Sequence, residues 1–222
     1  MSGSSIGYNY MSVIKIKNKF LSMKKTLKST ITLLVLLAAS VFSANAQSAK
    51  QYTLDKDRTS INFSINHLFS TVNGRFKTFD GSLNFDPKNL SGSKVNFTIN
   101  VPSVNTDNEK RDAHLQTEDF FDAAKYKNIT FTSTSFKKKS DKLFLVTGNL
   151  TIKNITKTVT LPMKITGMVD NPWKDNAVIF GISIETAINR NDYGVGTGSW
   201  AAGAIVGNNV NISINMEWDG SK

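Results

Sequence analysis

The chain has 222 residues, a formal net charge of +10 and no cysteine. The lack of cysteine excludes disulfides, thiolate metal sites, a cysteine nucleophile and an acylated cysteine anchor. The charge is unevenly placed: residues 1–47 hold six lysines and no acidic residue, so residues 48–222 carry 21 basic and 17 acidic groups, a net +4. Because this body has neither an arginine-rich helix nor zinc-finger spacing, we expect no nucleic acid as a partner.

The segment that starts at Met23 has the three parts of a secretory signal peptide. Lysines follow the methionine, an apolar stretch of about a dozen residues comes next, and a small-x-small site, Ala44-Asn45-Ala46, ends it. The apolar stretch is shorter than the roughly 20 residues that span a bilayer, so we expect cleavage rather than a stable membrane anchor.

This interpretation divides the chain into three parts. Residues 1–22 precede the signal peptide and are interpreted as a non-native upstream extension, and residues 23–46 are the signal peptide itself. Cleavage is predicted near Ala46/Gln47, which leaves residues 47–222 as one domain of ordinary size. We expect this mature domain to be periplasmic or secreted.

Most of the mature chain alternates apolar with polar residues, which predicts strands with one buried face. The clearest run is the last one, formed by Val210, Ile212, Ile214, Met216 and Trp218. Turn signals such as Asp80-Gly81 separate the runs, so successive strands are expected to pair in antiparallel fashion. About eight or nine such strands close either as a barrel or as a sandwich, and the pattern leaves both open.

Two segments depart from the alternation. Residues 107–126 are rich in charge and helix formers, which predicts one or two short helices, with a helix start at Thr117 before Glu118 and Asp119. Residues 194–207 contain five glycines and are predicted to form a mobile loop before the final strand.

The residues offer little support for catalysis. The two histidines, His67 and His114, do not form a zinc-type pair on one helix, and no Gly-x-Ser-x-Gly elbow occurs. We therefore expect no catalytic residue, no metal and no cofactor. One alternative is an enzyme or accessory factor that acts on a lipid or quinone precursor, with His67 and His114 as an acid/base pair. Another is a surface interaction module whose barrel is filled by side chains.

The fourteen phenylalanines fall mostly on the apolar phase of the predicted strands. They can pack only on one another, or they can surround a ligand. The interior of an eight-stranded barrel is just large enough for either arrangement, so periodicity does not decide between them.

Five long phrases follow one another between Tyr52 and Trp218: YTLDKDRTSINFSINH (52–67), GRFKTFDGSLNFDP (74–87), RDAHLQTEDFFDAAKYKNITFTST (111–134), VTGNLTIKNITKTVTLPM (146–163) and INRNDYGVG (188–196). In these phrases the chain resembles the YceI-like family of polyisoprenoid-binding proteins, and it departs at Asn154, where the family usually has glycine. The resemblance implies an all-β fold: an extended, antiparallel, eight-stranded, lipocalin-like β-barrel with a short helical insert. It also implies export, an apolar tunnel for a polyisoprenoid chain, and binding rather than catalysis.

Strand phase and resemblance together predict the residues of the site. We expect the lipid tunnel to be lined by Phe63, Ile65, Phe76, Phe97, Ile99, Phe120, Phe131, Leu150 and Ile152. The head-group end is predicted at His67, Arg111, His114 and Arg190, since Arg111 and His114 share a face if their segment is helical. In the alternative, Arg111 pairs with Asp112 or Glu118 on a solvated helix.

The function predicted from these observations is that of an exported binding or carrier protein, which holds a polyisoprenoid or isoprenoid-quinone lipid in the barrel interior. The isoprenoid lipid is the expected partner, and a homodimer stays open.

Overall fold

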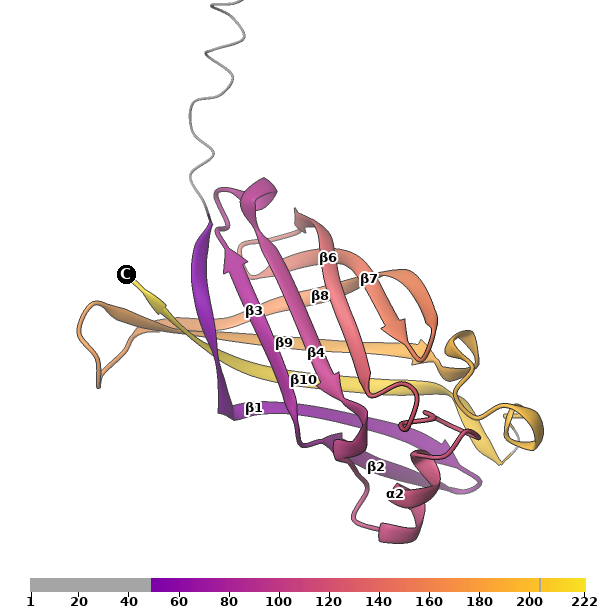
Figure 1. The fold of residues 1–222 in the computed structure, drawn as a ribbon. Coiled ribbons are helices and arrows are strands. Elements are labelled where there is room, and N and C mark those ends of the chain that lie inside the picture. Colours follow the sequence, from indigo (N-terminus) through magenta and orange to yellow (C-terminus); the bar gives the residue numbers. More distant parts are fainter. Residues whose placement is uncertain (1–48, 204) are drawn as a thin grey trace, which may run out of the picture. The chain divides into compact units, whose positions relative to one another are not determined.

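A computed structural model describes residues 49–203 and 205–222 (Figure 1). The upstream extension, the signal peptide and its cleavage site therefore lie outside the described residues. Residues 47–222 make up a compact unit of their own. Within the described part, no helix is long and apolar enough to cross a membrane.

The described chain is built mainly of strands. They are β1 (Lys50–His67), β2 (Ser70–Phe76), β3 (Phe79–Phe85), β4 (Lys94–Asn100), β5 (Val104–Asn105), β6 (Asn128–Lys138), β7 (Leu143–Ile152), β8 (Ile155–Asp170), β9 (Ala177–Asn189) and β10 (Val206–Ser221). The helical elements are the α-helix α2 (Glu109–Leu115) and the 3-10 helices η1 (Leu90–Gly92), η2 (Val101–Ser103), η3 (Arg190–Tyr193) and η4 (Gly198–Trp200).

Eight of the strands close into an antiparallel barrel in the order β1, β3, β4, β6, β7, β8, β9 and β10, with β10 paired back to β1. The predicted eight-stranded, lipocalin-like barrel is therefore confirmed. The sequence did not predict the branch formed by β2 and β5, in which β2 pairs with the second half of β1 and the short β5 extends β2.

A break in β1 allows this strand to serve both the ring and the branch. Its register with β10 is interrupted between Asp55 and Ser60. There the Asp55 carboxylate accepts hydrogen bonds from the backbone N–H groups of Asp57 and Arg58, at 3.0 and 3.1 Å. The strand turns at this point, so its first half pairs with β3 and its second half with β2 (Figure 1).

The predicted insert contains a short helix, but its start was placed wrongly. Helix α2 begins after Asn108, whose side chain accepts a hydrogen bond from the Arg111 N–H at 3.0 Å. The Thr117 hydroxyl donates to the His114 carbonyl at 2.8 Å, so Thr117 lies at the end of α2 and starts no helix of its own. An asparagine that reaches a free N–H is as good a helix start as threonine followed by acids.

One end of the barrel interior is packed with aromatic rings. We call Tyr52, Phe85, Phe136, Phe144 and Phe180 the aromatic plug. Phe144 and Phe180 are 0% exposed, and the Phe85 ring lies 5.1 Å and 5.7 Å from theirs between centroids. Ring pairs at such distances bury large apolar areas and attract each other. The plug therefore fills this end of the barrel completely.

Candidate functional site

The other part of the interior is hollow. A cavity of about 230 Å³ lies inside the barrel, and its surface is almost entirely apolar. The inward-facing side chains of the barrel strands and of β2 form its walls, and Leu83 and Trp218 line it on the side of the aromatic plug. None of the five plug residues lines the cavity.

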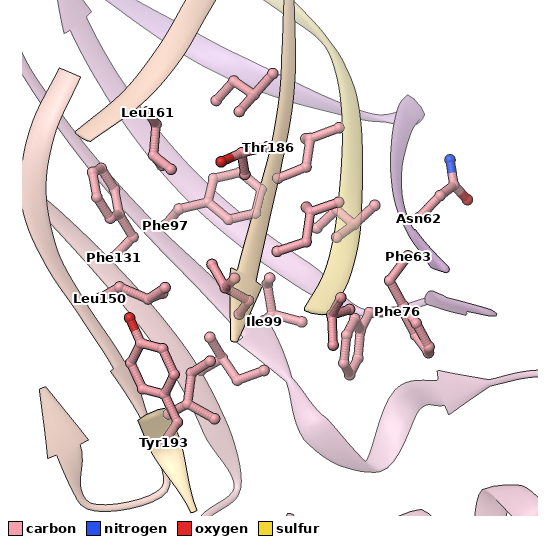
Figure 2. Close-up of a pocket in the computed structure, with 18 of the residues that line it drawn as sticks. Asn62, Phe63, Phe76, Phe97, Ile99, Phe131, Leu150, Leu161, Thr186 and Tyr193 are labelled. Atoms are coloured by element: carbon pink, nitrogen blue, oxygen red, sulfur yellow. The ribbon is translucent and has the colours of Figure 1, made fainter. Parts of the chain in front are cut away.

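All nine residues that were predicted to line a tunnel lie on this cavity: Phe63, Ile65, Phe76, Phe97, Ile99, Phe120, Phe131, Leu150 and Ile152. Figure 2 shows several of these side chains converging on one space from different strands. The register explains the agreement, because Phe97 of β4 stands opposite Phe131 of β6, and Phe131 stands opposite Leu150 of β7. Contact of these residues with a lipid stays a prediction.

Glycines explain how a barrel with so many phenylalanines keeps a hollow interior. Three inward-facing rings each cover a glycine of a paired strand: Phe63 covers Gly74, Phe97 covers Gly81 and Phe131 covers Gly148. A Cβ atom at any of these glycines would collide with the ring above it. A ring that covers a glycine lies along the wall instead of crossing the interior. These pairs supply apolar surface without filling the cavity.

Arg190 organises the loop at the end of the cavity away from the plug. Its side chain donates to five backbone carbonyls: Gly207 at 2.8 Å, Val195 at 2.9 Å, Gly196 at 2.7 Å, Trp200 at 2.5 Å and Val206 at 2.9 Å. Arg190 is 3% exposed, and burial lowers the pKa of its guanidinium. A guanidinium has five N–H donors, so in this conformation none is left for a lipid head group.

Arg190 and the helical insert together close this end, and we call residues 109–126 and 190–203 the cap. The His114 ring packs edge-on against Phe120 and Trp200, at centroid distances of 5.0 and 5.3 Å. Its Nε2 atom lies 3.0 Å from Asp119 Oδ2. The Trp200 carbonyl accepts a hydrogen bond from Arg190, so the two halves of the cap are linked through Trp200.

The structure brings three of the four predicted head-group residues to one end of the barrel. His67 pairs with Val206, whose carbonyl also accepts a hydrogen bond from Arg190, and His114 contacts the same loop through Trp200. Of the four, only Arg190 lines the cavity. No hydrogen bond joins His67 to His114 in the described part of the chain, and no cluster there could hold a metal ion.

Arg111 is directed elsewhere. Its Nε donates to the Thr106 hydroxyl at 2.7 Å and its Nη2 to the Thr106 carbonyl at 2.8 Å. Asp112 accepts hydrogen bonds from the backbone N–H and the hydroxyl of Thr106. Arg111 and Asp112 therefore both bind Thr106 and form no ion pair with each other. The segment is helical as predicted, but neither the head-group arrangement nor the surface ion pair of Arg111 is seen.

Comparison with known proteins agrees with this architecture. A family model for the YceI-like domain matches residues 52–218. The chain is 43% identical over 164 residues to protein YceI of Salmonella arizonae, across 72% of this chain and 84% of the relative. The chain belongs to the YceI-like family. The resemblance seen in the five sequence phrases is therefore confirmed.

Solved structures of the YceI-like family and of a related domain share the fold. The YceI protein of Campylobacter jejuni is 35% identical and superposes with a TM-score of 0.62, covering 77% of this chain and 98% of its own. A polyisoprenoid-binding domain of Saccharophagus degradans superposes with a TM-score of 0.56 at 16% identity, covering 76% and 98%. At that identity the likeness shows the shared fold alone.

Sequence reasoning missed two polar residues of this YceI-like cavity, Thr186 and Tyr193. Thr186 lies on β9 between Ile184 and Ile188, on the same inward face, and all three line the cavity. This single hydroxyl in an apolar row was a visible signal. Tyr193 follows β9 in η3 and gave no such signal, because its place depends on how the chain turns back into the barrel.

Proposed function

We propose that the protein is an exported carrier or binding protein that holds a polyisoprenoid or isoprenoid-quinone lipid in the barrel cavity. The observation that carries the proposal is an almost entirely apolar cavity inside the barrel of a member of the YceI-like family. The fold is shared with a domain of Saccharophagus degradans that binds polyisoprenoids. In this proposal the nine predicted tunnel residues contact the lipid chain, and neither a catalytic residue nor a cofactor takes part.

The walls suit a branched hydrocarbon chain. Burial of each aliphatic carbon contributes about 0.8 kcal/mol, so a five-carbon isoprene unit contributes about 4 kcal/mol before ordering costs. A few buried units are then enough for tight binding. The same arithmetic makes binding insensitive to the chain outside the cavity, so the protein would select its ligand by what fits inside.

A variant that fills the cavity tests this function. Leu150 faces the cavity from β7, and Leu145 lies on the opposite phase of the same strand. We expect mass spectrometry of organic extracts of purified residues 47–222 to find an isoprenoid lipid. We expect Leu150→Trp to reduce its amount at least tenfold, because the indole occupies the space of the chain.

Leu145→Trp is the matched control and should keep the lipid, because it makes the same exchange on the outer face. Circular dichroism of both variants checks that they are folded. Absence of lipid from the wild-type protein, or full retention by Leu150→Trp, would contradict the proposal.

Export is the second part of the proposed function, and it is supported by the signal-peptide pattern that ends at Ala46. We expect protein recovered from the periplasm or the medium to begin at Gln47, as determined by N-terminal sequencing. A secreted form that still carries residues 31–42 would refute the cleavage.

A further inference from the structure

We infer that the hydroxyls of Thr186 and Tyr193 bind an uncharged, oxygen-bearing group of the lipid, a carbonyl or a hydroxyl, within the cavity. This inference rests on the proposed function and adds the part of the ligand that the apolar walls do not specify.

The polar side-chain groups among the residues that line the cavity belong to Asn62, Thr186, Arg190, Tyr193 and Trp218. The Trp218 Nε1 atom is buried and makes no hydrogen bond, so it is not accessible to a ligand in this conformation. The Asn62 amide donates to the Ser60 hydroxyl at 3.3 Å and points away from the other labelled side chains in Figure 2. Arg190 uses all five donors on backbone carbonyls. The hydroxyls of Thr186 and Tyr193 make no hydrogen bond within the described residues.

Tyr193 is the better placed of the two. It is 2% exposed, lines the cavity, and has its hydroxyl directed toward Leu150 in Figure 2. Burial raises the pKa of this hydroxyl, with a smaller contribution from Asp192, so it stays protonated and able to donate at neutral pH. The hydroxyl is not sealed by protein atoms, so it faces the open space of the cavity, where an oxygen atom of a ligand can accept its hydrogen bond.

The surroundings hold Tyr193 in this position. Strand β8 pairs with β9 only from Met163 onward, which leaves a gap between the two strands, and η3 lies beside the first part of β8. Lys153 Nζ donates to the Gly194 carbonyl at 3.0 Å, and Lys157 Nζ lies 3.1 Å from Asp192 Oδ1. Gly194 ends η3 with φ at +63°, a conformation that glycine adopts without strain. These contacts tie η3 to the first part of β8 while the cap is closed.

The charge of the lining determines which oxygen groups fit. Arg190 is the only cationic residue on the cavity surface within the described chain, and its donors are engaged. A phosphate or pyrophosphate placed there would be buried without a cation to pair with, which is strongly unfavourable. A quinone carbonyl or a prenol hydroxyl needs only one or two hydrogen bonds, and either hydroxyl can donate one.

The test compares lipids that differ only at one end. Lipid-free residues 47–222 are titrated with geranylgeraniol, with the hydrocarbon that has hydrogen in place of its hydroxyl, and with geranylgeranyl pyrophosphate. The variants are Tyr193→Phe, Thr186→Val and the two combined, each close in shape to the original side chain. Tyr52→Phe is the matched control, because Tyr52 is 4% exposed but belongs to the plug and does not line the cavity.

We expect the combined variant to bind geranylgeraniol at least tenfold more weakly, and the hydrocarbon within twofold of the wild-type affinity. Tyr52→Phe should leave both affinities unchanged. Equal losses for alcohol and hydrocarbon, or no loss for either, would overturn the inference while leaving lipid binding intact. If geranylgeranyl pyrophosphate binds as tightly as geranylgeraniol and its affinity falls in the combined variant, the conclusion that the bound group is uncharged would be overturned. Failure of all three lipids to bind the wild-type protein would instead contradict the proposed function, and this inference with it.

Discussion

The aromatic plug and the cap close the two ends of one barrel by different means. At the plug, rings such as Phe85, Phe144 and Phe180 are at most 1% exposed and pack on one another. At the cap, five carbonyls between Val195 and Gly207 converge on the guanidinium of Arg190. Three of these carbonyls, those of Val195, Gly196 and Trp200, lie in the cap, and those of Val206 and Gly207 lie at the start of β10. Packing among side chains of several strands is lost only when the barrel itself comes apart, whereas a few hydrogen bonds between a loop and the end of one strand can be lost while the barrel stays closed.

This contrast assigns different roles to the two ends. The plug ends the cavity on one side. We expect a ligand to enter at the other side, where an opening of the cap need not disturb the barrel.

The largest effect is expected from Arg190→Met. The substitution keeps apolar bulk but leaves five carbonyls, two in buried and three in part-buried hydrogen bonds, without this donor, so we expect the free energy of unfolding to fall by about 4 to 6 kcal/mol. Urea unfolding of residues 47–222 measures this loss. The free energy of unfolding of Arg190→Lys should lie between those of the wild-type protein and Arg190→Met, since an ammonium keeps the charge but has three donors in place of five.

Arg75→Met is the control for the loss of an arginine as such. Arg75 pairs with Asp107 at 3.0 Å on the surface, with about half of its side chain exposed, so we expect a change below about 1 kcal/mol. If Arg190→Met were no more destabilising than Arg75→Met, the cap would not depend on the guanidinium.

Phe144 and Phe97 allow the plug to be compared with the cavity wall by the same substitution. Phe144 is 0% exposed and surrounded by rings, so Phe144→Ala should destabilise by about 3 to 5 kcal/mol. Phe97 borders the cavity and lacks neighbours on that side, so Phe97→Ala should cost about half as much and change the lipid content.

Urea unfolding and mass spectrometry of both variants provide the two measurements. A full core loss in Phe97→Ala with unchanged lipid would show that this ring only packs. Altered lipid in Phe144→Ala alone would place the site at the plug.

The sequence predicted the strands and their inner faces well, because strand alternation is a local property. The choice of a barrel over a sandwich came from the family resemblance. Phe97, Phe131 and Leu150 could each be assigned to the inner face from their own neighbours, and the register only had to bring them together. That the interior is hollow did not follow from alternation. It depends on Gly74, Gly81 and Gly148 lying under rings from other strands, and only the family resemblance pointed to a tunnel.

The cap was predicted less well, because its interactions join segments that are distant in the sequence or involve backbone groups. Arg190 was interpreted as a head-group ligand, yet its partners are carbonyls, which no side-chain pattern reveals. Thr117 was predicted to start a helix, but the free N–H groups of α2 are met by Asn108. The inward phase of Thr186 was readable from β9 and was overlooked.

The smallest predicted effect uses one tyrosine at each end. Burial is the main cause that raises the pKa of both Tyr52 and Tyr193, and the carboxylates of Asp86 and Asp192 add to it. A tyrosine becomes charged when it loses its proton, so a raised pKa means that the folded state keeps the proton after the unfolded state has lost it. Stability is therefore complete below about pH 10, the unfolded pKa, and falls as the pH rises through it.

Urea unfolding of the lipid-free protein at pH 8.5 and pH 11 measures this loss, which is limited to about 1.4 kcal/mol per pH unit for each tyrosine. Tyr52→Phe and Tyr193→Phe should each remove part of the difference, while Tyr126→Phe, at a half-buried residue outside the cavity, corrects for the exchange itself. Because the plug and the cap share no residue, the two effects should add in the double variant.

The two tyrosines also test whether the cap opens before the barrel unfolds. If it does, Tyr193→Phe will reduce the loss of stability at pH 11 less than Tyr52→Phe does, because an opened cap lets Tyr193 ionise in water. Equal protection would show that both ends unfold together, and the proposed entry through the cap would then lack its separate opening step.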